Sequence, residues 1–110
     1  MLGYPEGTRY TVLAPILLRE DRTMKQQLDI DMKQGFNRLE VNGEMVRIDE
    51  YEPKKEDTVF LLIDRMVASK EKDAISRLTD SAETAMYEGD GACLLRFYQP
   101  DGTTSLYRFS

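Results

Sequence analysis

The dipeptide Asn42-Gly43 constrains the fold of this chain more than any other feature of its sequence. Both residues tolerate the positive φ angles of a two-residue turn, so Asn-Gly is a strong signal for a tight β-hairpin. Residues 37–41 before the turn and residues 44–49 after it both alternate polar with apolar side chains. This period of two is typical of strands with one buried face, so the sequence predicts an antiparallel hairpin.

The alternation also assigns the hairpin side chains to faces. Successive residues of a strand point to opposite sides of the sheet, so Leu39 and Val41 are expected to face inward. Arg38 and Glu40 are then expected to face outward, toward solvent. The sequence therefore predicts that Arg38 is displayed on a rigid surface.

Four more strands are predicted outside this hairpin. The unbroken apolar run Val59–Ile63 is typical of a central strand covered on both faces, and we expect it to end at Asp64-Arg65. Residues 10–18 begin with a β-rich stretch, in which Pro15 either confines the strand to a sheet edge or ends its regular pairing. The chain closes with a hairpin that joins residues 92–98 to residues 105–109 through a Pro-Asp-Gly turn.

Two helices complete the expected elements. Thr23 and Gln26 have the spacing of a capping box, and apolar residues follow at intervals of four until Gly35 stops a helix over residues 23–34. A second helix is predicted over residues 71–87, ended by glycines. Its apolar stripe is interpreted as a face that packs on the core, and it consists of Ile75, Leu78, Ala82, Ala85 and Met86.

The order of these elements is β-α-β-β-β-α-β-β, which predicts an α+β fold. We expect a mainly antiparallel sheet with two helices on one side. No repeat, linker or low-complexity tract divides the chain, so residues 1–110 are treated as a single domain. The strand order within the sheet does not follow from the sequence.

Composition argues against several classes of function. The chain contains no histidine and only one cysteine, Cys93, which is expected to be a small buried hydrophobe rather than part of a disulfide or zinc site. No glycine-rich phosphate loop occurs, and no motif pairs a nucleophile with a base, so no enzymatic activity is expected. The net charge of -5 opposes unaided binding to nucleic acid phosphates. No apolar run is long enough to cross a membrane, and a cytoplasmic location is expected.

Four basic residues draw attention by their positions: Arg38, Lys54, Lys55 and Arg65. If the first hairpin neighbours the central strand, their side chains share one rim of the sheet. Arginine pairs with carboxylates through two parallel hydrogen bonds and is enriched at protein interfaces. From the pattern alone, solvated surface charges explain the same residues.

Five short segments resemble the UvrA family of bacterial damage-recognition ATPases, specifically its UvrB-binding domain. They occur in the family's order and cover most of the chain: Leu13-Ala14-Pro15, Lys33-Gln34-Gly35-Phe36 leading into Arg38, Asn42-Gly43-Glu44, Leu62-Ile63-Asp64-Arg65, and Ser81-Ala82-Glu83-Thr84-Ala85-Met86. The resemblance implies a domain excised from UvrA, whose ATP and zinc sites lie outside this segment. No cofactor is therefore expected in the fragment itself.

The resemblance also implies a partner and a site. The family's domain binds UvrB through a polar surface, and the arginines that serve as main contacts match Arg38 and Arg65. Lys54, Lys55 and Glu40 are weaker candidates for the same interface. Damaged DNA is then contacted by the parent complex rather than by this domain alone. Two alternatives stay open, namely a DNA-contacting surface and a small regulatory or ligand-binding domain.

The sequence departs from the family's pattern near this rim. Glu40 and Asn42 stand where the family commonly has arginine and aspartate, and Glu56-Asp57 replaces a lysine-histidine stretch. The predicted rim is consequently more acidic than is usual in the family.

Overall fold

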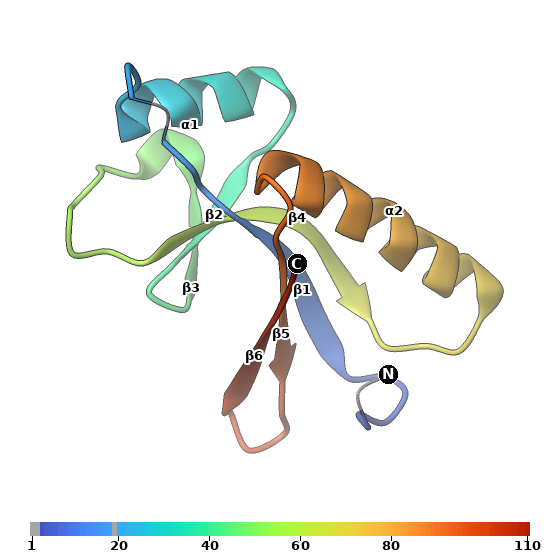
Figure 1. Cartoon of the computed structure of the whole chain (residues 1–110). Coiled ribbons are helices and arrows are strands. Elements are labelled where there is room, and N and C mark those ends of the chain that lie inside the picture. The colour runs from blue at the N-terminus through green and yellow to red at the C-terminus, as the bar shows by residue number, and fades with distance from the viewer. Residues whose placement is uncertain (1–2, 19) are drawn as a thin grey trace.

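The computed structural model describes residues 3–18 and 20–110. Six strands form one antiparallel sheet in the order β3-β2-β4-β1-β5-β6, and two helices lie over it (Figure 1). The elements are β1 Arg9–Pro15, α1 Met24–Lys33, β2 Arg38–Val41, β3 Glu44–Arg47, a 3₁₀ turn Ile48–Glu50, β4 Val59–Val67, α2 Lys72–Glu88, β5 Cys93–Tyr98 and β6 Thr104–Phe109. The predicted α+β class and element order are confirmed.

The predicted helix cap and the predicted tight turn are both present in the structure. Thr23 caps α1, and both hydrogen bonds of the capping box with Gln26 are present. Asn42 and Gly43 adopt φ values of 52° and 87°, as the tight turn between β2 and β3 requires. Both helices contribute to one core on the same side of the sheet, with Leu28 from α1 and Ala85 from α2 buried in it.

The first strand is not at an edge, because β1 pairs with both β4 and β5. Pro15 is instead its last residue, so the second alternative for this proline holds: it ends the regular pairing. The expectation for Ile75 is wrong, since 48% of this residue is exposed although the rest of its stripe packs on the core or is buried. Ile75 lies in the first turn of α2, beyond the part of the helix that covers the sheet.

Two expectations for the central strand are also wrong. The strand β4 does not end at Asp64-Arg65 but continues to Val67. It is not covered on both faces either, because Leu61 is the only fully buried residue of the run 59–63. Both helices lie on one side of the sheet, and Phe60 and Leu62, which point to the other side, remain partly exposed.

A β-bulge in β4 decides which side each of its residues faces. Val12 lies opposite Asp64 and Leu13 lies opposite Leu62, so Ile63 is an extra residue without a partner on β1. After the bulge, Asp64 faces the helices, as its contacts with α2 show, and Arg65 faces the other side, which we call the open face. A bulge also increases local twist, and the sheet in Figure 1 is strongly twisted.

Candidate functional site

Arginine side chains are concentrated on the open face. Strand pairing puts Arg65 and Arg96 on either side of Thr11, and Arg38 opposite Arg47. By the same alternation, six arginines belong to the open face: Arg9, Arg38, Arg47, Arg65, Arg96 and Arg108. Among the described strand residues, Glu40 is the only carboxylate there. Arg47 is paired with Asp49 and Arg96 with Glu40, so the other four arginines give this face a positive charge that is unmatched among the described residues, although the net charge of the chain is -5.

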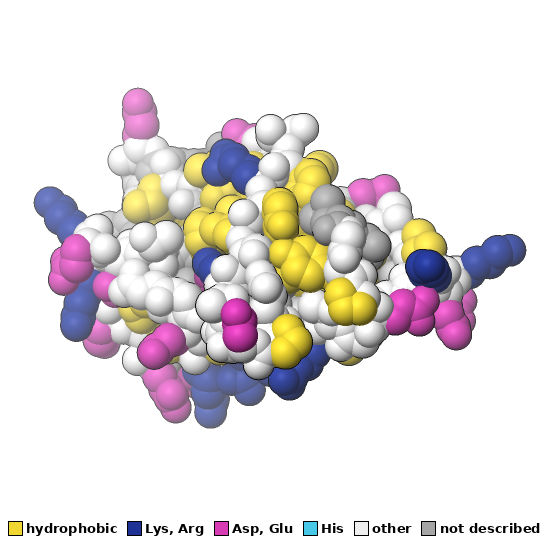
Figure 2. Space-filling view, turned by 90° about the horizontal axis from the view of Figure 1, so that it is seen from below, with side chains coloured by type: hydrophobic (Ala, Val, Ile, Leu, Met, Phe, Trp, Pro, Cys, Tyr) yellow, Lys and Arg dark blue, Asp and Glu magenta, His cyan; other side chains and the backbone are white. Residues whose placement is uncertain are grey.

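Charge is unevenly spread in the space-filling view as well. Lys and Arg side chains gather along the lower edge of the molecule, whereas apolar side chains gather nearer its middle (Figure 2). Such segregation creates a local field of sign opposite to the net charge. An acidic partner surface would be attracted to this part of the protein.

Arg38 and Arg65 line the same hollow, which measures about 360 Å³. It forms because β2 pairs with β4 only from Leu39 onward, so the chain before Arg38 diverges from β4. The segment that ends α1 closes one side and β4 the other. The lining residues are Gly35, Phe36, Asn37, Arg38, Leu62, Ile63, Asp64, Arg65 and Arg77. The structure therefore brings together the two arginines singled out from the sequence.

A third arginine of the hollow, Arg77, is held in an ion pair. Its Nε and Nη2 donate to the carboxylate of Asp64 at 2.9 and 2.6 Å, and Ser81 Oγ donates to the same carboxylate at 2.7 Å. Burial tends to raise the pKa of Asp64, but the hydrogen bonds from Arg77 and Ser81 outweigh it and hold the pKa below its ordinary value. The positive charge of Arg77 is therefore matched inside the domain.

Arg38 and Arg65 differ from Arg77 in this respect. Within the described parts of the chain, neither guanidinium forms an ion pair or a side-chain hydrogen bond. Arg38 is half-buried and Arg65 is exposed. Two unpaired guanidinium groups in one hollow provide donors for a carboxylate or another planar anion from outside.

The expectation that Glu40 faces solvent is wrong. Only 1% of Glu40 is exposed, and its carboxylate accepts hydrogen bonds from Arg96 Nε at 3.0 and 2.9 Å and an ion-pair contact from Nη2 at 2.8 Å. β2 and β5 are three strand positions apart, so a flat sheet would separate them by about 14 Å. The sheet must therefore curl over its open face, and that curl buries Glu40.

Lys54 and Lys55 are exposed, but they do not line the hollow with Arg38 and Arg65. They lie in the loop before β4, whereas Arg65 lies six residues beyond the first residue of that strand. Six residues of strand span about 20 Å, so the four basic residues do not share one rim.

Sequence reasoning missed Arg77 and Arg96. For Arg96 a signal existed, because Cys93, Leu95 and Phe97 occupy one face of β5 and leave Arg96 on the other. Arg77 lies on a polar helix face, where nothing in the sequence distinguishes it from a solvated charge. Its partner Asp64 is recognisable only once the bulge is known.

Two negative findings apply to the residues that the structure describes. No group of three or more potential metal-ligating side chains occurs among them. None of the helices in that part of the chain has the length and apolarity needed to cross a membrane.

Comparison with known proteins agrees with the resemblance. The family model described as the UvrA interaction domain matches residues 1–99. UvrABC system protein A of Bacillus subtilis (strain 168) is 35% identical over 98 residues, covering 86% of this chain and 10% of that protein. The proteins of the same name from Listeria monocytogenes serotype 4b (strain F2365) and Agrobacterium fabrum are 37% and 33% identical over 83% and 88% of this chain. The chain thus spans about a tenth of the length of these curated relatives. It belongs to the UvrA interaction domain family.

Proposed function

We propose that this chain is a docking domain that binds UvrB during bacterial nucleotide excision repair. One observation carries the proposal: Arg38 and Arg65 lie in the same hollow, and their guanidinium groups have no ion-pair partner in the described part of the chain. The family description, an interaction domain, and the name of the relatives, a UvrABC system protein, support a partner within that system. Repair of damaged DNA and ATP hydrolysis belong to the longer parent protein in this proposal, and the domain acts in the cytoplasm without catalysis or cofactor.

In this mechanism the two arginines form charge-assisted hydrogen bonds with carboxylates of UvrB. The ion pair with Asp64 keeps Arg77 beside them, and Arg77 Nη2 also lies 3.4 Å from the main-chain oxygen of Arg65. Ordering the hollow before binding lowers the entropy lost on association. Because the contacts are polar and partly exposed, UvrB is able to leave after it has been delivered to the damage.

The test is a calorimetric titration of UvrB into the 110-residue chain at moderate salt. Arg38→Glu and Arg65→Glu are each expected to weaken binding at least tenfold, which corresponds to about 1.4 kcal/mol. Lys55→Glu reverses the same charge at an exposed site outside the hollow, so it serves as the matched control and should bind normally. Unchanged affinity in both arginine variants would refute the assignment.

A second candidate, a DNA-contacting surface, is favoured by the six arginines of the open face. A gel shift with a short duplex at low salt separates the two functions. The docking function predicts no shift, because the net charge of -5 repels phosphate. A shift that disappears in Arg9→Glu or Arg108→Glu, at arginines outside the hollow, would favour the DNA surface.

A further inference from the structure

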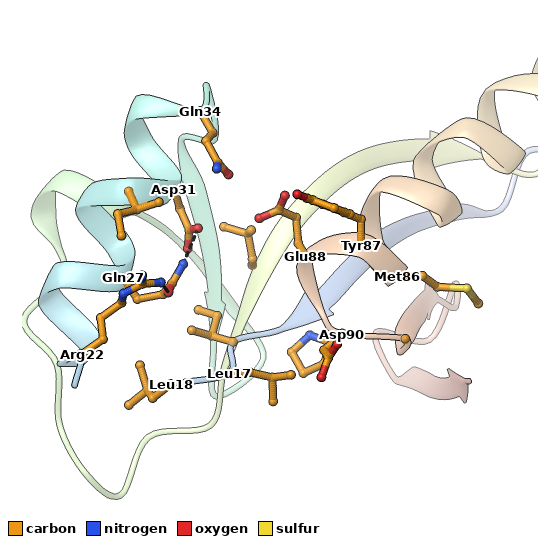
Figure 3. Close-up of a pocket in the computed structure, with 15 residues that line it drawn as sticks. Leu17, Leu18, Arg22, Gln27, Asp31, Gln34, Met86, Tyr87, Glu88 and Asp90 are labelled. Atoms are coloured by element: carbon orange, nitrogen blue, oxygen red, sulfur yellow. Dashed lines mark hydrogen bonds between the residues drawn. The ribbon is translucent and has the colours of Figure 1, made fainter. Parts of the chain in front are cut away.

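A second concavity, of about 740 Å³, separates the C-terminal half of α1 from the C-terminal end of α2 (Figure 3). We call it the interhelix groove, and it shares no lining residue with the arginine hollow. Its rim is apolar and open, since Leu17 and Leu18 are about half exposed, at 47% and 49%, and Tyr87 is 83% exposed. Apolar side chains gathered around a concavity are typical of a binding surface.

The floor of the interhelix groove is acidic. Asp31 is only 2% exposed, and its Oδ1 accepts a hydrogen bond of 3.0 Å from Gln27, whose side-chain oxygen accepts one of 2.7 Å from Arg22. The other carboxylate oxygen of Asp31 has no hydrogen-bond partner among the described residues. This oxygen is not among the described buried side-chain atoms that lack a partner, so it is open to the groove, where a donor from outside can reach it.

Glu88 faces the same space from the other side. Figure 3 shows the carboxyl groups of Asp31 and Glu88 both directed into the gap between the helices. Burial and then the charge of Asp31 raise the pKa of Glu88, and burial raises the pKa of Asp31. Glu88 is also the last residue of α2, where the helix dipole disfavours a negative charge. The last turn of α2 contains no basic residue that would offset this effect. Ionisation of either carboxylate is therefore less favourable here than in free solution, and a cation placed between them would offset this.

Among the residues that the structure describes, the other charged groups of the interhelix groove do not cancel this field. Arg22 reaches Asp31 only through Gln27, and Asp90 adds a third carboxylate. Phosphates are repelled by such a site, and no set of ligands for a metal ion occurs among the residues described. The ligand that fits is an organic cation attached to apolar groups.

We propose that the interhelix groove binds a segment of a partner protein, which places one lysine or arginine side chain between Asp31 and Glu88. Aliphatic neighbours in that segment pack on Leu17, Leu18 and Tyr87. Charge complementarity selects the basic residue, and the exposed apolar rim selects a peptide over a free amine or a polyanion. This site does not include Arg38 or Arg65, so a test of it is separate from a test of the UvrB-docking function.

The test uses the 110-residue chain labelled with ¹⁵N and two capped tripeptides, acetyl-Leu-Arg-Leu-amide and its citrulline analogue. Citrulline keeps the size of arginine and removes its charge. The arginine peptide is expected to bind in the low millimolar range, as suits so small a ligand, and to shift the amide signals of Ile30, Asp31 and Gly91. The citrulline peptide is expected to bind about tenfold more weakly.

Two variants localise the effect. Glu88→Gln should weaken the arginine peptide about tenfold and should fold normally, because it removes an unfavourable charge. Glu83→Gln removes a charge from an exposed position of α2 outside the groove and should leave binding unchanged. Equal binding of the two peptides, shifts that map elsewhere, or no shifts at all would overturn the proposal. Shifts that depend on protein concentration without peptide would identify a second copy as the occupant and would also overturn it.

Discussion

The buried ion pair between Glu40 and Arg96 allows a quantitative test of the curled sheet. Replacing Arg96 by methionine keeps most of the side-chain volume but leaves the carboxylate of Glu40, only 1% exposed, without its partner. Breaking a buried ion pair in this way typically costs about 3–5 kcal/mol. Urea unfolding of a domain of this size has a slope of about 1–1.5 kcal/mol/M, so the midpoint should fall by roughly 2–5 M.

The double variant Glu40→Met/Arg96→Met decides whether the cost comes from the unpaired charge. Apolar replacement of a whole buried pair is often neutral or stabilising, so the double variant should recover most of the loss. Arg108→Met is the control, because Arg108 is exposed on the same face and should change stability by less than about 0.5 kcal/mol. If Arg96→Met stays within about 1 kcal/mol of the parent, or the double variant is no more stable than the single one, the carboxylate of Glu40 is not buried in the way that the curled sheet requires. Urea unfolding followed by circular dichroism at neutral pH measures all four proteins.

Two further predictions concern α2 and its partner strand. Gly89→Ala should lower the unfolding free energy by about 1–3 kcal/mol, because an added Cβ would lie 2.5 Å from the oxygen of Ala92 and 2.6 Å from Pro15 Cδ; a thermal melt unchanged from the parent would contradict this packing. Asp64→Asn should make the free energy of unfolding depend less on pH in acid. Because the pKa of Asp64 is lowered in the folded state, its carboxylate stabilises the fold at pH values above the ordinary pKa of about 4, and this stabilisation is lost as the pH falls through the folded-state pKa. Urea midpoints between about pH 5 and pH 2 measure the difference, and equal acid slopes in the parent and the variant would contradict the ion pair with Arg77.

Local features of the fold were predictable because their causes are local. The tight turn at Asn42-Gly43 and the capping box at Thr23 depend on a few neighbouring atoms, and both form as expected. The class and the order of the elements follow from hydrophobic periodicity in the same way. The strand order could not be predicted from the sequence because it depends on contacts between residues far apart along the chain.

The error over Glu40 originates in the shape of the sheet. The alternation correctly placed Arg38 and Glu40 on the same face, but only the curl between β2 and β5 determines that Glu40 is buried there. For Asp31 a usable signal was overlooked: it lies three residues after buried Leu28, on the same face of α1.

Arg38 and Arg65 were chosen from their positions and a family resemblance, and the structure places both in one hollow. Their role in binding UvrB stays a prediction until it is measured. What the sequence could not supply was the contrast with Arg77, whose charge is satisfied by Asp64. That contrast separates an arginine that supports the hollow from two that are available to a partner.

The unpaired Ile63 has a consequence for comparing relatives of this domain. Asp64 faces the helices and Arg65 faces the open face only because β4 accommodates one extra residue before them in a bulge. A relative with the same residues but a regular ladder would place its isoleucine opposite the valine of β1, which would direct the aspartate outward and the arginine toward the helices. Aligned letters alone therefore do not show that two members of the family present the same arginine, and the pairing register of this strand has to be compared as well.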